Sequence, residues 1–453
     1  MSSLWDGFAS RSAPHLWQQL CSLQTVSRRN RTLLVNWEER AQRFEMTTSG
    51  ILEYSQSETE MATPQKAAVK LEGRPVWAEV SLTALEANLR AMRRHIGTQR
   101  KILAVVKGNA YGHGAVPVSK ALARAGADWF GVTCSGEGTE LREAGLRQPI
   151  LVLTGFWPGE EKRIIENRLT PAITRCDQLE LLERAAARLK VSPRRPIGFH
   201  MKIDTGMNRL GIALGDVECF ARQLAACPHL KLTGTFTHFA SSEVFTTEQT
   251  AEQQKLFGQA LDRLRGLGID PGVVHLANSA AIVSRPETWA AMVRPGALLY
   301  GYHQNYDPPE RRAAAEKELK VTPALSLRAR VISVRDVPAG SGVGYDARFT
   351  TSRPSRIAVI AAGYADGLLR SLGNRGSVLV RGQKAPLVGI VSMDLAMADV
   401  TGIAGAALGD IATIYGADGD SAQYASDVAR QLGTVTSDIL CALGKRVPRF
   451  YLR

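Results

Sequence analysis

The stretch that decides the fold reads ILAVVK at residues 102–107 and continues as GNAYGHG at residues 108–114. Its first five residues are all apolar, and such an unbroken run of strand length is typical of a strand buried on both faces of a parallel sheet. Lys107 comes directly after the run, so we expect it at the carboxyl end of the strand. The glycines that follow it predict a loop.

Seven further apolar runs of strand length follow, and stretches with helical spacing, such as residues 177–189 and 248–267, lie between them. Repeated strand–helix units predict a parallel sheet, and eight units are the number that closes a (β/α)8 barrel. A doubly wound sheet is the alternative, but no G-x-G-x-x-G motif follows the first strand. The eight runs are residues 102–106, 129–132, 150–153, 171–173, 197–203, 232–236, 273–276 and 291–293.

The pattern changes on both sides of these runs. Before them, residues 76–80 alternate like a strand, and Ser81 is suited to cap a helix over the stretch that follows. After Gly301, strand-like segments are joined by Gly, Pro and Asp turns, and only the tail from residue 421 onward looks helical. The strand-like segments are residues 322–334, 355–362, 377–380, 385–391, 397–400 and 410–415.

The sequence therefore predicts an α/β fold with a (β/α)8 barrel at residues 75–312, followed by a mainly β C-terminal domain at residues 313–453. The strand at residues 76–80 could join the β domain. Residues 1–74 are polar and show no sustained hydrophobic periodicity, so we expect a poorly packed N-terminal extension. We find neither a secretory signal pattern nor an apolar run near the roughly 18 residues of a membrane span, which predicts a cytoplasmic protein without a membrane partner.

The composition of the 453 residues excludes several classes of protein. Hydrophobic residues at 45% and charged residues at 22% are ordinary globular values, which excludes wholesale disorder. The formal net charge of +13 comes from scattered basic residues without interleaved aromatic side chains, so it predicts a solvated basic surface and no nucleic-acid site. The six cysteines form no C-x-x-C pair and no histidine cluster has zinc spacing, so we expect free thiols and no metal site.

Functional groups of a (β/α)8 barrel lie at the carboxyl ends of its strands, so the residues after each run are the candidates. Lys107 follows the first run, where a buried lysine readily forms Schiff bases, although an isolated lysine is more often a rim residue. The segment HMKIDTGMNRLG at residues 200–211 follows the fifth run, and a structural ion network would explain its charges equally well. His238 follows the sixth run, where a lone histidine is more often a packed core residue.

Small residues follow the seventh and eighth runs, in HLANSA at residues 275–280 and in RPGA at residues 294–297. They suit the phosphate site that barrels commonly form there, because backbone N–H groups can approach an anion closely. A lysine, a histidine, an arginine and an anion cradle around one barrel mouth imply a phosphorylated carbonyl cofactor, and hence pyridoxal phosphate (PLP).

The chain resembles bacterial alanine racemases, which are fold-type III PLP enzymes. The resemblance runs from Val76 to the C-terminus; each motif alone is weak, but nine in the family's order are specific. The motifs are AVVKGNAYGHG at residues 104–114, HMKIDTGMNRLG at 200–211, THFA at 237–240, HLANSA at 275–280, VRPGALLYG at 293–301, VGYD at 343–346, GYADG at 363–367, VSMD at 391–394 and KRVPRFY at 445–451.

The resemblance implies that the chain interconverts L-alanine and D-alanine by a two-base mechanism and supplies D-alanine for peptidoglycan. Lys107 would hold PLP covalently and act as one base. Tyr345 would be the other base and would reach from the β domain into the barrel of the partner in a homodimer with shared active sites. Two bases are needed because a single base cannot easily reach both faces of the substrate's α-carbon.

The resemblance also implies which residues bind the cofactor and the substrate. Arg294 would face the pyridine nitrogen, and Lys202 would be the lysine that often carries a carbamate in this family, paired with Arg209. The full set of cofactor-binding residues would be Lys107, Tyr111, Arg209, His238, Asn278, Ser279, Arg294, Gly296 and Ala297. The substrate-binding residues would be Arg209, Met393 and Asp394, with Tyr364 at the entrance of the site.

One position departs from the family pattern. Ser437 stands where the family usually has a tyrosine that reaches the PLP phosphate, which leaves the breadth of the substrate range open. Three alternatives share part of the resemblance. A broad-spectrum amino-acid racemase is usually exported, a non-catalytic PLP-binding barrel lacks the β domain, and a fold-type III decarboxylase shares the architecture, whereas GYADG and VSMD belong to the racemase pattern.

Overall fold

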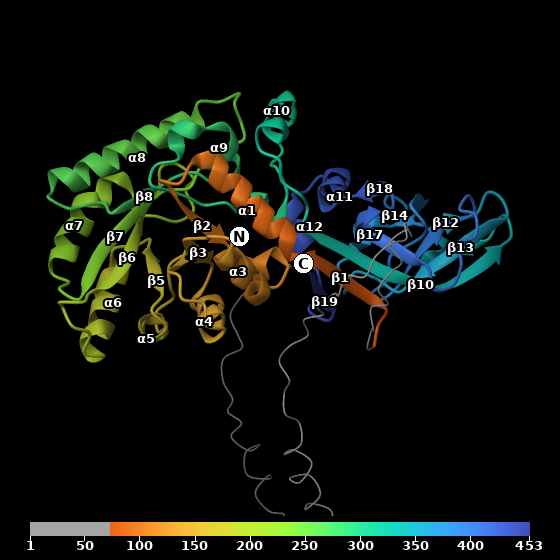
Figure 1. Cartoon of the computed structure of the whole chain (residues 1–453), viewed down its shortest axis with the longest axis horizontal. Helices are drawn as coiled ribbons and strands as arrows, with labels where there is room; N and C mark the ends of the chain where they lie inside the picture. The colour runs from red at the N-terminus through yellow and green to blue at the C-terminus, as the bar shows by residue number, and fades with distance from the viewer. Residues whose placement is uncertain (1–72) are drawn as a thin grey trace, which may run out of the picture. The chain divides into compact units, whose positions relative to one another are not determined.

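The computed structural model describes residues 73–453, which are drawn in colour in Figure 1. The predicted N-terminal extension at residues 1–74 therefore lies almost entirely outside the described residues, as does Cys21. The five cysteines of the described part are free thiols. Over residues 73–453, no helix has the length and apolar character needed to cross a membrane.

Eight parallel strands form a nearly closed barrel in the order β8-β7-β6-β5-β4-β3-β2-β9 (Figure 1). Each of the eight apolar runs forms one strand, because its side chains are buried in the barrel interior or under the surrounding helices. The predicted (β/α)8 barrel is confirmed. Its strands are β2 (Lys101–Val105), β3 (Trp129–Val132), β4 (Ile150–Val152), β5 (Thr170–Ile173), β6 (Ile197–Lys202), β7 (Leu230–Phe236), β8 (Val273–His275) and β9 (Met292–Val293).

Helices cover the outside of the barrel (Figure 1). Helix α1 (Leu82–Ile96) begins at the predicted cap, where the Ser81 hydroxyl accepts a hydrogen bond from the Ala84 N–H at 3.1 Å. Its apolar residues recur every three or four positions and are buried. The remaining α-helices of this part are the short α2 (Lys107–Tyr111), whose backbone is mostly left-handed, α3 (Ala115–Arg124), α4 (Ser135–Glu143), α5 (Glu161–Glu166), α6 (Asp177–Arg188), α7 (Val217–Ala225), α8 (Gln249–Gly266), α9 (Ser279–Ser284) and α10 (Glu310–Glu318).

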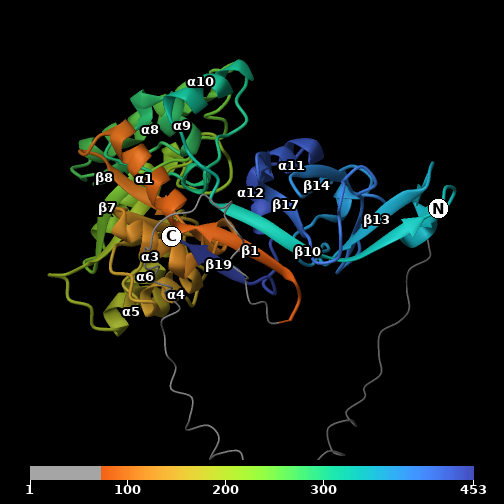
Figure 2. The same cartoon turned by 45° about the vertical axis from the view of Figure 1, so that its right-hand side comes forward.

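The C-terminal part is built on a mainly antiparallel sheet around the long strand β10 (Leu325–Val337), as predicted (Figure 2). Strand β1 (Val76–Ser81) pairs with β10 and also with β19 (Arg449–Leu452), so the first described strand belongs to this sheet. The other strands of this part are β11 (Gly342–Val343), β12 (Phe349–Thr350), β13 (Ser355–Ile360), β14 (Ser377–Val380), β15 (Gln383–Pro386), β16 (Ala396–Asp399), β17 (Ile411–Asp418) and β18 (Ser421–Gln423).

The predictions for this sheet need three corrections. The segment predicted over residues 385–391 is a strand only as far as Pro386, whose nitrogen cannot donate to a ladder. The tail is not helical from residue 421, because a turn with Gly419 at φ 61° folds β18 back onto β17 before α11 (Ala425–Leu432) and α12 (Thr436–Cys441) begin. Strand β19 was not predicted. The boundary between residues 312 and 313 falls inside α10 and stays a prediction.

Asn88 on α1 connects the end of the barrel to the start of β10. Its buried amide group donates to the carbonyl oxygens of Leu299 at 3.0 Å and Thr322 at 2.9 Å, and its oxygen accepts from the Thr322 N–H at 2.8 Å. Replacing Asn88 with alanine would leave the buried Leu299 carbonyl and two partly buried backbone groups of Thr322 without this partner.

We therefore expect Asn88→Ala to lower the free energy of unfolding by about 1–3 kcal/mol, because an orphaned buried carbonyl costs this much and the Thr322 groups are only partly shielded from water. Urea unfolding followed by circular dichroism measures this change. The control is Asn167→Ala, which removes an exposed hydrogen bond to the Arg163 carbonyl and should cost less than about 0.5 kcal/mol. Equal effects of the two substitutions would contradict the role given to Asn88.

Candidate active site

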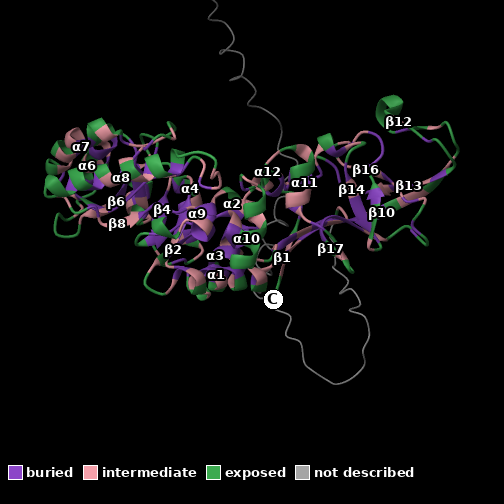
Figure 3. Cartoon of the chain, turned by 90° about the horizontal axis from the view of Figure 1, so that it is seen from above, coloured by how far each residue is buried: buried purple, intermediate pink, exposed green. Residues whose placement is uncertain are grey.

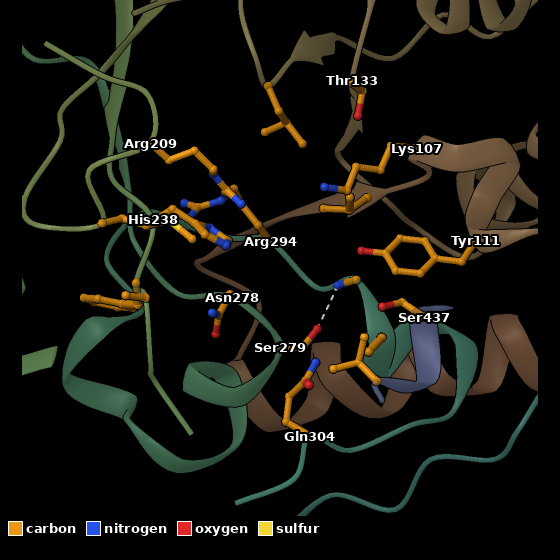
Figure 4. Close-up of a pocket in the computed structure, with 18 of the residues that line it drawn as sticks. Lys107, Tyr111, Thr133, Arg209, His238, Asn278, Ser279, Arg294, Gln304 and Ser437 are labelled. Atoms are coloured by element: carbon orange, nitrogen blue, oxygen red, sulfur yellow. Dashed lines mark hydrogen bonds between the residues drawn. The ribbon is translucent and has the colours of Figure 1, made fainter. Parts of the chain in front are cut away.

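A cavity of about 500 Å³ opens at the carboxyl ends of the barrel strands (Figure 4). It is lined by residues that follow seven different strands, which lie far apart in the sequence. Ten predicted site residues line this one cavity: Lys107, Tyr111, Lys202, Arg209, His238, Asn278, Ser279, Arg294, Gly296 and Ala297. Ser437 from α12 also lines it.

A left-handed turn follows Lys107. Residues 108–112, from Gly108 to Gly112, all have positive φ angles, between 52° and 79°. This conformation costs about 1–2 kcal/mol for each non-glycine residue, so the surrounding structure must impose it. The Asn109 side chain accepts a hydrogen bond from the Ala115 N–H at 2.8 Å and thereby joins the turn to α3. As a result, Lys107 and Tyr111 both point into the cavity (Figure 4).

Glu137 supports this turn and was missed by the sequence reasoning. Its carboxylate accepts hydrogen bonds from the backbone N–H groups of Gly108 and Thr133, each at 2.7 Å. The carboxylate therefore ties the ends of β2 and β3 together beside Lys107. The only trace in the sequence is an acidic residue in the first turn of a helix, which is common and carries no functional information by itself.

The electrostatics of the cavity favour a reactive lysine. Burial and the neighbouring Arg209 lower the pKa of Lys107, although Glu137 and Cys441 raise it in part. Burial also lowers the pKa of Lys202 to about 8, helped by Arg209 and Arg294. A lysine with a lowered pKa is more often unprotonated at neutral pH, and the unprotonated amine is the nucleophilic form.

Arg294 is buried at the bottom of the cavity and is held by four of its five N–H groups. One terminal nitrogen donates to the carbonyl oxygen and to Nδ1 of His275, at 2.8 and 2.9 Å. The other donates to the carbonyl oxygens of Thr237 at 2.7 Å and Leu276 at 2.8 Å. No residue in the described part of the chain accepts from Nε–H, and Arg294 lines the cavity, so this donor is available to a ligand.

The charge state of this region follows from burial. Burial lowers the pKa of Arg294 to about 9, so its guanidinium stays protonated at neutral pH. Burial and the charge of Arg294 hold the pKa of His238 well below its usual value, so His238 is neutral. Its Nδ1 lies 3.3 Å from the Arg294 guanidinium. The site therefore combines a fixed cation with a neutral imidazole.

Hydroxyl groups and a backbone N–H line the opposite end of the cavity. The Gly296 N–H donates to the Ser279 hydroxyl at 2.9 Å, and a Cβ atom at Gly296 would lie 2.7 Å from the Tyr111 hydroxyl oxygen. Burial raises the pKa of Tyr111 to about 12, so its hydroxyl stays protonated and can donate. Because the Gly296 N–H is already bonded to Ser279, the Ser279 and Tyr111 hydroxyls are the donors that remain here. Two neutral hydroxyl donors around a position without a side chain suit an anion with several oxygens.

The structure of one chain does not bring the other four predicted residues to this cavity. Tyr345, Tyr364 and Met393 lie in the C-terminal part, with 67%, 39% and 52% of their surface exposed. Figure 3 shows exposed residues around β12, which follows the turn that carries Tyr345. Asp394 is paired with Arg446 at 2.6 Å.

A buried carboxylate holds the segment that carries Tyr364 and Met393. The carboxylate of Asp366 is fully buried and accepts from Arg446 at 2.8 Å and from Arg74 at 3.1 Å. The backbone N–H of Tyr364 donates to the Ser392 carbonyl at 3.0 Å, which joins the two segments. The backbone that carries the exposed Tyr364 and Met393 side chains is therefore held by ion pairs and a hydrogen bond. Among residues 73–453, no group of three or more His, Cys, Asp or Glu side chains could hold a metal ion.

Comparisons with known proteins cover both parts of the chain. Residues 80–304 match the model for the alanine racemase N-terminal domain, and residues 324–451 match that for the alanine racemase C-terminal domain. An alanine racemase of Halothermothrix orenii is 39% identical over 378 residues, which are 83% of this chain and 97% of the relative. An alanine racemase of Sorangium cellulosum is also 39% identical, over 387 residues, covering 83% of this chain and 99% of the relative.

Solved structures agree with these matches. The alanine racemase of Bacillus anthracis with bound L-Ala-P has a TM-score of 0.78 at 34% identity and covers 84% of this chain and 96% of that one. The alanine racemase of Streptomyces lavendulae has a TM-score of 0.77 at 33% identity, with coverage of 84% and 98%. The resemblance seen in the sequence motifs is confirmed, and the chain belongs to the alanine racemase family of enzymes.

Proposed function

We propose that the chain interconverts L-alanine and D-alanine with PLP bound in this cavity, and that it supplies D-alanine for peptidoglycan. The observation that carries the proposal is the convergence of Lys107, Arg294 and the Ser279 and Tyr111 hydroxyls on one cavity, in a chain that matches the family over both parts. The cytoplasm, where this precursor is needed, is the proposed location.

The cavity fits PLP at both of its ends. A Cβ atom at Gly296 would fill the space beside the Tyr111 hydroxyl, so the glycine leaves room for a phosphate among the donors. Lys107, with its lowered pKa, lies where it can bind an aldehyde covalently. When bound, PLP supplies an electron-withdrawing ring that stabilises negative charge on the substrate's α-carbon. The residues that would hold it are Lys107, Tyr111, Arg209, His238, Asn278, Ser279, Arg294, Gly296 and Ala297.

Arg294 would face the ring nitrogen with its free Nε–H. A guanidinium that stays charged donates a hydrogen bond without giving up its proton. It would therefore leave the ring nitrogen unprotonated and restrain side reactions such as transamination. His238 would pack against the ring as a neutral imidazole, and Arg209 would lie near the phenolic oxygen.

Two bases would move the proton at the substrate's α-carbon. Lys107 would serve one face, and the partner subunit's Tyr345 would serve the other. The exposure of Tyr345 and its absence from the cavity of its own chain support a homodimer with shared active sites. The same exposure supports a position of Met393 and Tyr364 at the partner's cavity, near the substrate and the entrance, with Asp394 beside them.

Lys202 is proposed to carry a carbamate. Its amine is buried next to Arg209, and its pKa of about 8 leaves part of it unprotonated at neutral pH. The unprotonated nitrogen would bond to the carbon of CO₂ and release one proton, which turns a neutral amine into an anion. The new carboxylate would pair with Arg209 and orient it.

Lys107→Ala is expected to abolish racemisation and to leave the protein colourless, because both the covalent attachment and one base are lost. The wild-type protein should be yellow with PLP, and borohydride should fix the cofactor to the peptide that contains Lys107. Chiral chromatography of L-alanine incubated with protein and PLP measures the activity, and growth of a D-alanine-requiring bacterium tests the supply role. Lys120→Ala, an exposed lysine on α3, is the control and should change neither property. No D-alanine from the wild-type protein would overturn the proposal.

Mixing inactive Lys107→Ala with inactive Tyr345→Phe should restore up to about a quarter of the wild-type activity, because half of randomly mixed dimers contain both chains and each of these has one intact site. Subunit exchange is checked with differently tagged chains. If exchange occurs and activity stays absent, the active sites are not shared between subunits.

Ser437→Tyr is expected to tighten PLP binding and to lower the turnover of L-serine relative to L-alanine. Ser437 lines the cavity with Tyr111 and Ala297, and its hydroxyl is much shorter than that of a tyrosine. One additional hydrogen bond to a charged group is worth roughly 1.5–3 kcal/mol, or about 10- to 150-fold in affinity. PLP titration and the ratio of serine to alanine turnover are the measurements, with Ser437→Ala as the control. An unchanged affinity and ratio would show that the substitution has no role in binding or specificity.

A further inference from the structure

Two histidines occupy the interior of the barrel beneath Arg294. His200 on β6 and His275 on β8 are both fully buried. The neighbouring interior residues are apolar, as is usual for barrels, and include Leu103, Leu151 and Met292. Burying two imidazoles among apolar side chains costs free energy unless their ring nitrogens are hydrogen-bonded.

The two rings form a chain of hydrogen bonds that ends at Arg294. Nδ1 of His200 lies 2.9 Å from Nε2 of His275, and Nδ1 of His275 lies 2.9 Å from the Arg294 guanidinium. A guanidinium can only donate, so Nδ1 of His275 must accept. The proton of a neutral His275 is therefore on Nε2, where it donates to Nδ1 of His200. The proton of His200 is then on its own Nε2.

Both rings are neutral in this arrangement. Burial and the charge of Arg294 lower the pKa of His200 to about 3 and hold the pKa of His275 well below its usual value. The positive charge of Lys101 lowers the pKa of His200 further, and the neighbouring His200 lowers the pKa of His275 further. A protonated His275 would point an N–H at the Arg294 N–H groups, which the geometry does not allow.

The packing holds His200 in this position at a cost. A Cβ atom at Gly234 would lie 2.6 Å from the His200 ring, so β7 has no side chain there and the imidazole fills the space. Nε2 of His200 has no hydrogen-bond partner among residues 73–453. Leaving this donor unpaired is unfavourable, and an apolar side chain would avoid it. The benefit of a histidine must therefore come from Nδ1, which faces His275.

We propose that His200 is a positioning residue for Arg294, which it holds by fixing the tautomer of His275. Arg294 has five partners, of which three are backbone carbonyl oxygens, which always accept. The other two are Nδ1 of His275 at 2.9 Å and, at a longer 3.3 Å, Nδ1 of His238. Nδ1 of His275 makes the shorter of these two contacts, and it becomes a donor if the ring changes tautomer. His200 prevents this change and so keeps Nε–H of Arg294 directed into the cavity. The inference rests on the proposed function in one respect, namely that Arg294 faces a cofactor ring in the cavity.

The test compares two amides at position 200. His200→Asn places an amide oxygen where Nδ1 was, so it can still accept from His275. His200→Gln has more of the volume of histidine, but its amide reaches the position of Nε2 and leaves His275 without an acceptor. His200→Leu fills the space without a polar atom and replaces the Gln variant if that protein is unstable.

Nitrogen-15 spectra of histidine-labelled holoenzyme, without substrate, report the tautomer of His275. We expect an unprotonated Nδ1 in the wild type and in His200→Asn, and a protonated or mixed Nδ1 in His200→Gln and His200→Leu. Racemisation should follow the spectra: kcat should fall about 10- to 100-fold in the Gln and Leu variants, as for a misplaced catalytic group, with a smaller change in KM, and it should stay near wild type in His200→Asn.

Two results would overturn the inference. One is an unchanged tautomer of His275 in His200→Gln and His200→Leu. The other is an equal loss of kcat in the Asn, Gln and Leu variants, which would show that the ring acts only by packing. Because the spectra need no substrate, a failure of the proposed alanine activity would appear separately, as a wild-type protein with the expected tautomer but without racemisation.

Discussion

Parallel pairing of the barrel strands is the constraint on which the rest of the structure depends. Parallel strands all run in one direction, so their carboxyl ends must meet at the same rim. The register of β2 with β3 and of β6 with β7 keeps these ends level. Lys107, His238 and Arg294 therefore meet at one cavity although long segments of chain separate them.

The cavity contains features that are unfavourable by themselves. The left-handed turn after Lys107 strains three non-glycine residues, and Arg294 is a buried cation held by carbonyl oxygens and an imidazole rather than by a carboxylate. Two histidines take the place of apolar residues in the barrel interior. The close packing around them makes these features possible, and such concentrations of strain and buried polarity are typical of functional sites.

The C-terminal sheet joins the two ends of the described chain. Strand β1 lies between β10 and β19, so the segment that leads into α1 and the last strand are held side by side. The Gly112 position touches the Leu440 carbonyl of α12, where a Cβ atom would come within 2.2 Å, so the turn that carries Tyr111 is packed against the C-terminal part. The sheet thus supports the cavity from its own chain and presents Tyr345 outward, where a partner could use it.

Local patterns in the sequence were sufficient to predict the barrel. Each of its strands is a short apolar run, and a strand of the barrel is buried whatever its position around the barrel. They also located the segments that line the cavity, since strand ends in a parallel barrel share one rim, whereas the full set of individual residues came from the resemblance to the family. They did not predict β18 or β19, the end of β15 at Pro386, the role of Glu137 at the turn, or the hydrogen bonds from His200 to Arg294.

Strand β19 forms because it pairs with β1, more than 360 residues away. The tautomers of the two histidines are set because a guanidinium, which can only donate, lies beside His275. Such features depend on contacts between distant segments, and only the tertiary structure decides those contacts.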